Sequence, residues 1–243
     1  MDILYIVMPA YNEEAIIEET IRKWYPIIED KCDESRLVIA DSGSCDSTHD
    51  ILEHLKKVFP KLVVLSDTKK EHGPKVIDLY SFSIQNGADF IFQTDSDGQT
   101  NPDEFSSFWN LRNEKDAVIG VRTVRGDGTS RKIVENILCI LLRIYFGIRI
   151  KDANAPYRLM RAEILKKYMQ QLPEDYNLPN VMLTTYFAYY KENIEFREIS
   201  FDARQGGKNS INIGKIIKIG WKSLYEFYLF RKNINRVNAK PVE

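Results

Sequence analysis

The sequence contains few of the residues that build disulfide frameworks or zinc sites. Among its 243 residues there are only three cysteines and three histidines. Cys32, Cys45 and Cys139 are odd in number and far apart, which argues against both kinds of site. We recognise no secretory signal at the start. The longest apolar run, residues 137–148, is interrupted by Arg143 and falls short of the roughly 20 residues that span a bilayer. These absences predict a cytoplasmic protein.

An excess of charge of one sign is also missing. Lys and Arg total 34, Asp and Glu total 35, and the formal net charge is −1. A dedicated nucleic-acid-binding protein usually carries a basic excess, so we exclude that class. Hydrophobic residues make up 44% of the chain, which is typical of a globular protein. Since no linker or repeat interrupts the pattern, we expect one catalytic domain over residues 1–212 and a basic amphipathic helix and tail over 213–243.

The first half of the chain alternates short apolar segments with amphipathic ones. The pattern predicts strands at residues 3–8, 37–40, 62–65, 90–94 and 117–121. Helices are expected between them, one of which begins at Asn101-Pro102-Asp103-Glu104 with a cap, a proline and two acids. The second half predicts helices at 130–146, 162–170, 180–191 and about 213–231, an extended segment at 155–160 and a strand at 195–201. This order predicts an α/β fold with a mostly parallel sheet and helices on both faces.

Ligands of such sheets bind beyond the carboxyl ends of the strands. The segments that follow the predicted strands are polar or turn-forming, and they are Pro9-Ala10-Tyr11-Asn12-Glu13, Asp41-Ser42-Gly43-Ser44, Asp95-Ser96-Asp97 and Arg122. Three of the four carry a carboxylate. The pattern therefore predicts a polar site at one edge of the sheet.

Asp95 and Asp97 stand two residues apart after an apolar strand. Two nearby carboxylates remain ionised together when they share a cation, and hard cations such as Mg²⁺ or Mn²⁺ prefer oxygen ligands. The alternative is a solvated turn, because Asp, Ser and Gly also favour turns.

Glycine-rich phosphate loops are another absence. Dinucleotide-binding proteins also end their second strand with an acid, as Asp41 does, but they carry Gly-x-Gly-x-x-Gly after the first strand. Here Tyr11-Asn12-Glu13 occupies that place, and no Walker loop occurs elsewhere. A nucleotidyltransferase, which joins phosphates with paired carboxylates and a metal, usually opens with a glycine-rich basic loop as well. That rival is therefore less favoured.

These segments together resemble the family 2 glycosyltransferases, which have the Rossmann-like GT-A fold. The matching stretches are residues 8–14, 39–48 and 94–99. Later stretches are similar to the dolichol-phosphate mannose synthase branch and its bacterial polyprenyl-phosphate relatives, and they are Gly120-Val121-Arg122, Ser130-Arg131, residues 152–160 and residues 204–210.

The resemblance implies a site for a nucleotide-sugar donor such as a UDP- or GDP-sugar. The residues implied to line it are Pro9, Tyr11, Glu13, Asp41, Lys75, Asp95, Ser96, Asp97 and Gln99. Among these, Asp95 and Asp97 would hold Mg²⁺ or Mn²⁺. The residues implied to take part in catalysis are Asp97, Arg122, Arg131, Asp152 and Arg204. In this group, the arginines would bind the acceptor phosphate or the departing diphosphate.

The implied reaction is an inverting sugar transfer to a polyprenyl or dolichyl phosphate or to a glycan. A lipid phosphate is already anionic and needs no strong base, whereas a sugar hydroxyl, as in capsule, exopolysaccharide or cell-wall assembly, must lose a proton. Glu174 or Asp175 could take that proton, and the alternative is that they form a turn. A non-catalytic nucleotide-sugar-binding module stays open as a function of another class.

The predicted C-terminal helix is basic and amphipathic. Lys215, Lys218 and Lys222 lie between apolar residues at helical spacing. Such a helix either lies on an anionic membrane surface or packs its apolar face on the sheet. A lipid-linked acceptor favours peripheral contact with a membrane.

Overall fold

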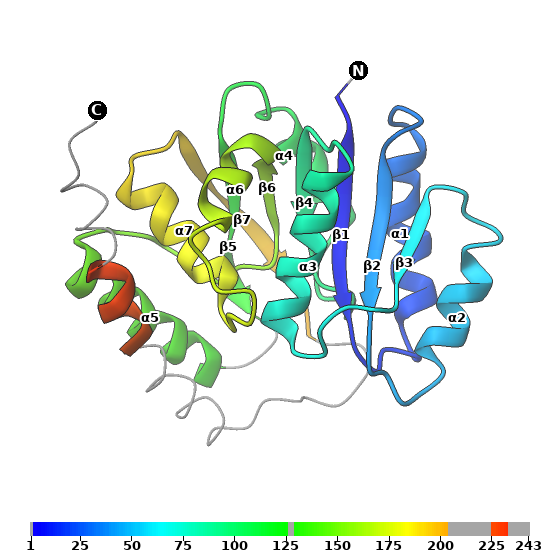
Figure 1. Ribbon diagram of the computed structural model, residues 1–243, viewed down its shortest axis with the longest axis horizontal. Helices are drawn as coiled ribbons and strands as arrows, with labels where there is room; N and C mark the ends of the chain where they lie inside the picture. Colours follow the sequence, from blue (N-terminus) through cyan, green and yellow to red (C-terminus); the bar gives the residue numbers. More distant parts are fainter. Residues whose placement is uncertain (1, 126–128, 204–224, 233–243) are drawn as a thin grey trace.

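The computed structural model describes residues 2–125, 129–203 and 225–232. Within them a seven-stranded sheet has helices on both faces (Figure 1). The strands are β1 (Leu4–Ala10), β2 (Arg36–Asp41), β3 (Leu62–Leu65), β4 (Phe90–Gln93), β5 (Ala117–Arg125), β6 (Arg158–Arg161) and β7 (Ile194–Phe201). The helices are α1 (Ile17–Glu29), α2 (Thr48–Leu55), α3 (His72–Gln85), α4 (Phe105–Trp109), α5 (Thr129–Phe146), α6 (Ala162–Met169) and α7 (Pro179–Tyr189), with a 3₁₀ turn η1 (Pro102–Glu104) before α4.

The strand order is β3-β2-β1-β4-β6-β5-β7. Strands β3, β2, β1 and β4 pair in parallel, and so do β5 and β7. Strand β6 is antiparallel to both of its neighbours, β4 and β5. The predicted α/β fold with a mostly parallel sheet is confirmed. The alternation of strands and helices in the sequence did not predict that β6 would lie antiparallel between β4 and β5.

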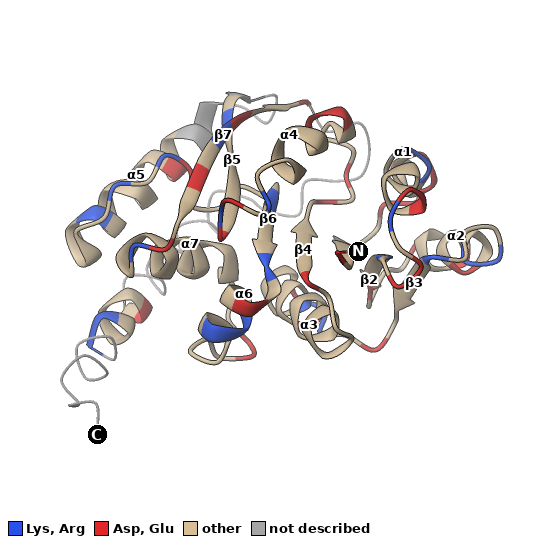
Figure 2. Ribbon diagram, turned by 90° about the horizontal axis from the view of Figure 1, so that it is seen from above, with Lys and Arg blue, Asp and Glu red and all other residues tan. Residues whose placement is uncertain are grey.

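Two apolar clusters lie on opposite faces of the sheet. One contains Trp24 of α1, Phe92 of β4 and Tyr157, whose rings pack edge to face or tilted against one another. The other joins the sheet to α3, α6 and α7 and includes Tyr80 and Phe187. Figure 2 shows α1 and α4 on one side of the sheet and α3 and α6 on the other. Because β1 lies in the middle and both its faces are covered, every residue of β1 is buried.

Local signals set several helix starts. The Asn101 side chain accepts a hydrogen bond from the amide of Asp103 at 3.0 Å, as the predicted cap requires. Before α2, Asp46 Oδ1 accepts from the amide of Thr48 at 3.0 Å. Ser44, in the same loop, donates to Asp41.

Residues 225–232 are helical and coincide with the end of the predicted C-terminal helix. The rest of that helix, its three lysines, Arg204 and the predicted boundary at residue 212 lie outside the described residues. Within residues 2–125, 129–203 and 225–232, no helix is both long and apolar enough to cross a membrane.

Gly73, in the first turn of α3, provides a test of how tightly this helix is fitted to the fold. A Cβ atom built there would lie 2.4 Å from the backbone oxygen of Asn177. We expect Gly73→Ala to lower the free energy of unfolding by about 1–3 kcal/mol, because the backbone must shift. Urea denaturation measures this. Ser106→Ala, at an exposed position of α4, is the control and should change it by less than about 0.5 kcal/mol. Equal stability of the two variants would contradict the expectation.

Candidate active site

Three loops leave the sheet at the same edge. In the parallel register, Ala10 pairs with Asp41, so β1 and β2 end together, while β4 ends opposite Val7, three residues before the end of β1. The loops that follow contain most of the residues predicted to bind a nucleotide sugar. The convergence that the sequence predicted at the carboxyl ends of the strands is therefore present.

The loops after β1 and β2 are joined by hydrogen bonds. The amide of Asn12 donates to Ser44 Oγ at 3.0 Å, and Asn12 Oδ1 accepts from the amide of Cys45 at 2.8 Å. The next amide, that of the buried Glu13, donates to Thr48 Oγ1 at 2.8 Å. Asn12 has a φ of 55°, a left-handed conformation that asparagine tolerates better than most residues. These bonds fix one loop relative to the other.

Lys75 lies beneath these two loops. Its ammonium group, on the first turns of α3, donates to the carbonyl oxygens of Ala10 at 2.7 Å and Ser42 at 3.2 Å. The side chain is almost fully buried. Burial lowers the pKa of Lys75, while the negative charges of Asp41 and Glu71 oppose that shift. Lys75 and Asp41, both implied to line the donor site, are thus close enough for their charges to interact.

Asp41 and Tyr11 offer a carboxylate and an aromatic ring, respectively, at the edge of the sheet where the loops after β1 and β2 begin. The Asp41 carboxylate is buried, accepts from Ser44 Oγ at 2.5 Å and lies 3.3 Å from His49 Nδ1. Tyr11 is 44% exposed, and its ring centroid lies 5.8 Å from the Lys75 ammonium. An exposed ring beside a fixed carboxylate offers a stacking surface and a hydrogen-bond acceptor to a planar ligand.

The loop after β4 carries the two predicted metal ligands. Ser96 Oγ donates to the carbonyl oxygen of Pro9 at 2.9 Å, which ties this loop to the end of β1. Asp97 Oδ1 accepts from the amide of Gln99 at 3.2 Å, and Gly98 has a φ of 74°. The loop is therefore a turn, but it is not solvated, because Ser96, Asp97 and Gln99 are buried. The metal-binding interpretation stays a prediction.

The donor set at this turn fits a divalent cation that also binds a ligand. Two carboxylates supply the hard oxygen atoms that Mg²⁺ or Mn²⁺ prefers. In the part of the chain that the structure describes, no group of three or more His, Cys, Asp or Glu side chains could hold a metal ion. Asp95 and Asp97 would thus need further oxygen ligands from a bound molecule or water.

Gln99 joins the acidic turn to the chain that follows β7. Its Nε2 donates to the carbonyl oxygen of Asp202 at 2.6 Å, and the amide of Asp202 donates to the carbonyl oxygen of Gln99 at 2.9 Å. Gln99 therefore lies beside Asp97, and its side-chain amide binds the chain that follows β7.

Arg122, at the carboxyl-terminal part of β5, lies between two carboxylates. Its Nε and Nη2 donate to the two oxygens of Asp152 at 2.8 and 2.9 Å, and Nη2 lies 3.6 Å from Glu135 Oε2. The side chains of Arg122, Asp152 and Glu135 are 8%, 3% and 11% exposed. Glu135 also accepts from the amide of Ala153 at 2.7 Å. The phosphate-binding role of Arg122 stays a prediction, and the structure adds its two carboxylate partners. Arg131 lies in the first turn of α5.

Sequence reasoning missed Glu135. It is the one acidic residue between positions 129 and 146, in a helix whose other charged residues are all basic. That isolation was the available signal. A lone acid in an apolar helix either reaches solvent or pairs with a buried cation, and here it turns toward Arg122.

Glu174 and Asp175 form a turn. The amide of Tyr176 donates to the carbonyl oxygen of Pro173 at 3.1 Å across it. The Glu174 side chain is 90% exposed and pairs with Lys69 at 3.2 Å. The turn that the sequence analysis offered as the alternative is confirmed.

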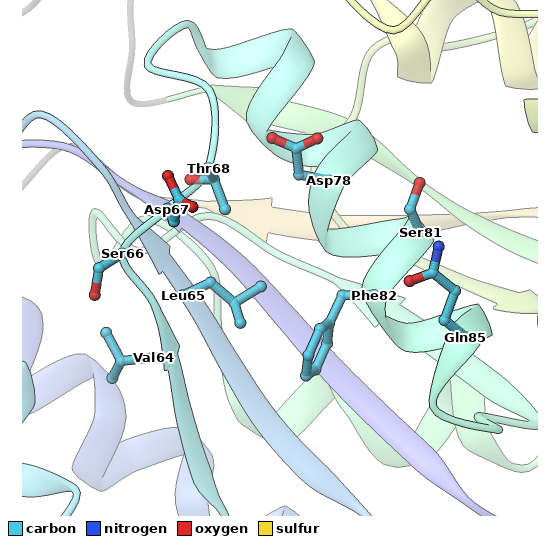
Figure 3. Close-up of a pocket in the computed structure, with 9 residues that line it drawn as sticks. All are labelled: Val64, Leu65, Ser66, Asp67, Thr68, Asp78, Ser81, Phe82 and Gln85. Carbon is cyan, nitrogen blue, oxygen red and sulfur yellow. The ribbon is translucent and has the colours of Figure 1, made fainter.

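A separate cavity of about 430 Å³ lies between β3 and α3, away from the acidic turn. Leu65 and Phe82 line it, with Asp67 and Thr68 after the strand and Ser81 and Gln85 on the helix (Figure 3). Its lining contains none of the predicted site residues.

The sequence profile described as Glycosyl transferase family 2 matches residues 5–169. The chain therefore belongs to this family of glycosyltransferases, as its motifs predicted. Among curated relatives, the undecaprenyl-phosphate mannosyltransferase of Micrococcus luteus is 28% identical over 166 residues, covering 66% of this chain and 67% of its own length. The polyprenol monophosphomannose synthase of Mycolicibacterium smegmatis is 25% identical over 170 residues, covering 67% and 63%. The matches thus span about two thirds of these relatives.

Solved structures support the GT-A fold. Glucosyl-3-phosphoglycerate synthase of Mycobacterium tuberculosis, solved with Mn²⁺ and UDP-glucose, has a TM-score of 0.70 at 18% identity and covers 93% of this chain and 79% of its own. The UDP complex of the same enzyme has a TM-score of 0.66, with 95% and 80% covered.

The buried pair of Arg122 and Asp152 gives a second prediction. Asp152→Asn should lower the free energy of unfolding by about 3 kcal/mol, because removing one partner of a buried ion pair leaves a charge less well compensated. Urea denaturation measures the change. Asp202→Asn is the control: the side chain of Asp202 is exposed, and the residue binds Gln99 only through its main-chain atoms. This variant should change the free energy of unfolding by less than about 0.5 kcal/mol. A loss of that small size in Asp152→Asn would contradict the account.

Proposed function

We propose that the chain transfers a sugar, with inversion, from a nucleoside-diphosphate sugar to the phosphate of a polyprenyl-type lipid. Family membership and the names of the curated relatives support this function. The single observation that carries it is the joining of the loops after β1, β2 and β4. Ser96 ties the Asp95–Asp97 turn to Pro9, and Lys75 ties Ala10, at the end of β1, to Ser42, just after β2.

The donor would lie along this edge. Tyr11 and Asp41 would contact the base and ribose, with Pro9 and Glu13 shaping the pocket and Lys75 fixing its floor. The diphosphate would lie at the acidic turn. The sugar would then point toward Asp152, which lies on the β5 side of the sheet with Arg122.

Asp95 and Asp97 would hold Mg²⁺ or Mn²⁺. A solved relative in fold was crystallised with Mn²⁺ and UDP-glucose, which supports a cation at this place. When bound, the cation would neutralise the charge that develops on the leaving diphosphate. The chain's own contribution is to hold both carboxylates in one turn. Ser96 and Gln99 fix that turn to the end of β1 and to the chain after β7.

In the proposed step, an oxygen of the acceptor phosphate forms a bond to the anomeric carbon. The bond from that carbon to the diphosphate oxygen breaks, and the electron pair leaves with the nucleoside diphosphate. The nucleophile is already anionic, so no strong base is needed. The exposed, Lys69-paired Glu174 is consistent with a chemistry that does not use it as a base. Arg131 and Arg204 would join Arg122 in binding phosphate oxygens.

We propose further that one side of the molecule rests on a membrane. Along α5, the exposed residues Ile133, Ile137, Ile140 and Ile144 recur at helical spacing. Residues 225–232 lie beside α5 (Figure 1), where Phe227 packs on Phe146. Exposed apolar rows of this kind mark interaction surfaces. A basic amphipathic segment over 213–243 would extend this surface, and 1–212 would form the catalytic domain.

The acidic turn provides the direct test of donor binding. Asp95→Asn combined with Asp97→Asn should reduce cation-dependent sugar transfer at least about 100-fold, because the charge on the leaving group loses its stabilisation. Transfer is measured with Mn²⁺ or Mg²⁺ against UDP- and GDP-sugars. Asp103→Asn, at an exposed carboxylate in η1, is the matched control and should retain activity. Unchanged turnover in the double variant would exclude this role of the turn.

The membrane contact is tested by sedimentation with anionic phosphatidylglycerol-containing vesicles at low salt. Ile137→Asp combined with Ile144→Asp should release most of the protein, since charges oppose burial of that face in lipid. Neutralising Lys215, Lys218 and Lys222 together should also release it. Val58→Asp, at an exposed apolar position beyond α2, should bind like the unaltered chain. Absence of vesicle binding by the unaltered chain would end the proposal.

A further inference from the structure

A chain of buried side-chain hydrogen bonds ends at Asp95. Gln93, the last residue of β4, is fully buried and donates from Nε2 to Asp95 Oδ1 over 3.4 Å. Its Oε1 accepts from Nδ2 of Asn180 at 2.8 Å. Asn180 Oδ1 accepts in turn from the Tyr80 hydroxyl, also at 2.8 Å. The chain thus runs from α3 through α7 to the acidic turn after β4.

The direction of the donors follows from the carboxylate at the end of this chain. An ionised carboxylate only accepts hydrogen bonds, so Gln93 turns its NH₂ group to Asp95 and its carbonyl oxygen to Asn180. Asn180 must then turn its own NH₂ group to Gln93 and its oxygen to Tyr80. Reversing the Gln93 amide would place a carbonyl oxygen against Asp95. The Tyr80 hydroxyl also lies 3.3 Å from Gln93 Oε1, so Asn180 and Tyr80 both favour the orientation in which the NH₂ group of Gln93 faces Asp95.

Arg158 fixes the middle of this chain of hydrogen bonds, at Asn180. Its fully buried guanidinium donates from Nη1 to the carbonyl oxygen of Asn180 at 3.1 Å and to Thr184 Oγ1 at 3.3 Å. Nη2 and Nε donate to the carbonyl oxygen of Ala155 at 2.9 and 3.1 Å. Arg158 also pairs with Gln93 in the register of β4 and β6. Since these bonds hold the first turn of α7 on the sheet, Asn180 keeps its position relative to Gln93.

We propose that Gln93, Asn180 and Tyr80 are positioning residues that hold the Asp95 carboxylate in the orientation in which it receives a divalent cation. The inference rests on the proposed function for what Asp95 binds. Carboxylates that bind metals are themselves held by hydrogen bonds, and loss of such a partner typically weakens metal binding by roughly 10- to 100-fold. The three residues act through Asp95 and do not touch the cation.

Asn180→Asp tests the direction of the chain. The variant keeps its size and still accepts from Tyr80, but it loses the NH₂ group that faces Gln93. The new carboxylate competes with Asp95 for the NH₂ group of Gln93, so the hydrogen bond to Asp95 is weakened. We expect Mn²⁺ affinity to fall about tenfold. Tyr80→Phe removes only the hydroxyl and should cause a smaller, roughly threefold loss. Affinity is measured by titrating Mn²⁺ into the full chain and following free Mn²⁺ by electron paramagnetic resonance, with UDP and GDP in separate series.

Two further variants separate the possible failures. Thr185→Val removes a buried hydroxyl on α7 that bonds within the helix to Val181, and it should leave Mn²⁺ affinity unchanged. If Asp95→Asn binds Mn²⁺ as the unaltered chain does, the proposed role of Asp95 fails. If Asp95→Asn loses Mn²⁺ while Asn180→Asp and Tyr80→Phe retain full affinity, the proposed function stands and the positioning role is overturned. Thermal unfolding shows whether each variant is folded. If Asn180→Asp does not fold, the Mn²⁺ affinity of Tyr80→Phe tests the positioning role alone.

Discussion

The register of three parallel strands determines where the proposed donor site lies. Ala10 pairs with Asp41, so β1 and β2 end at one level, while β4 ends opposite Val7 and its loop continues past Pro9, where Ser96 Oγ donates to the Pro9 carbonyl. The loops are polar and bury little apolar surface, so hydrogen bonds hold them together. Lys75 contributes most directly, because its buried ammonium group joins the ends of β1 and β2 from below. A shift of one residue in either pairing would turn the side chains of that strand to the opposite face and separate the loops.

The sequence predicted the strands and helices that have a local signature, such as a short apolar run or an amphipathic segment. The expected strand at 62–65 coincides with β3, and the expected helix at 130–146 differs from α5 by one residue. The loops after β1, β2 and β4 followed from the rule that parallel sheets bind ligands at their carboxyl ends. Strand β6 could not be placed in the sheet in the same way. It lies between β4 and β5 because Arg158 pairs with both Gln93 and Ile119, and such long-range pairing has no local signature.

In the candidate site, too, local motifs were predictable from the sequence and long-range contacts were not. Motifs identified Arg122 and Asp152, but the bidentate bond between them joins residues 30 positions apart, and Glu135 enters from a separate helix. The guanidinium of Arg122 is already held by two carboxylates, so a phosphate that binds there would have to compete with them. The Gln93–Asn180 bond spans 87 positions, so only the folded arrangement reveals it.

Phosphorus NMR tests the central claim most directly. The unaltered chain is incubated with a nucleotide sugar, a divalent cation and a polyprenyl phosphate. The account predicts that the acceptor phosphomonoester signal is replaced by that of a phosphodiester, with one equivalent of nucleoside diphosphate released, and that chelating the cation stops both changes. Release of nucleoside diphosphate while the phosphomonoester persists would contradict it, because the sugar would then have gone to water or to a hydroxyl group.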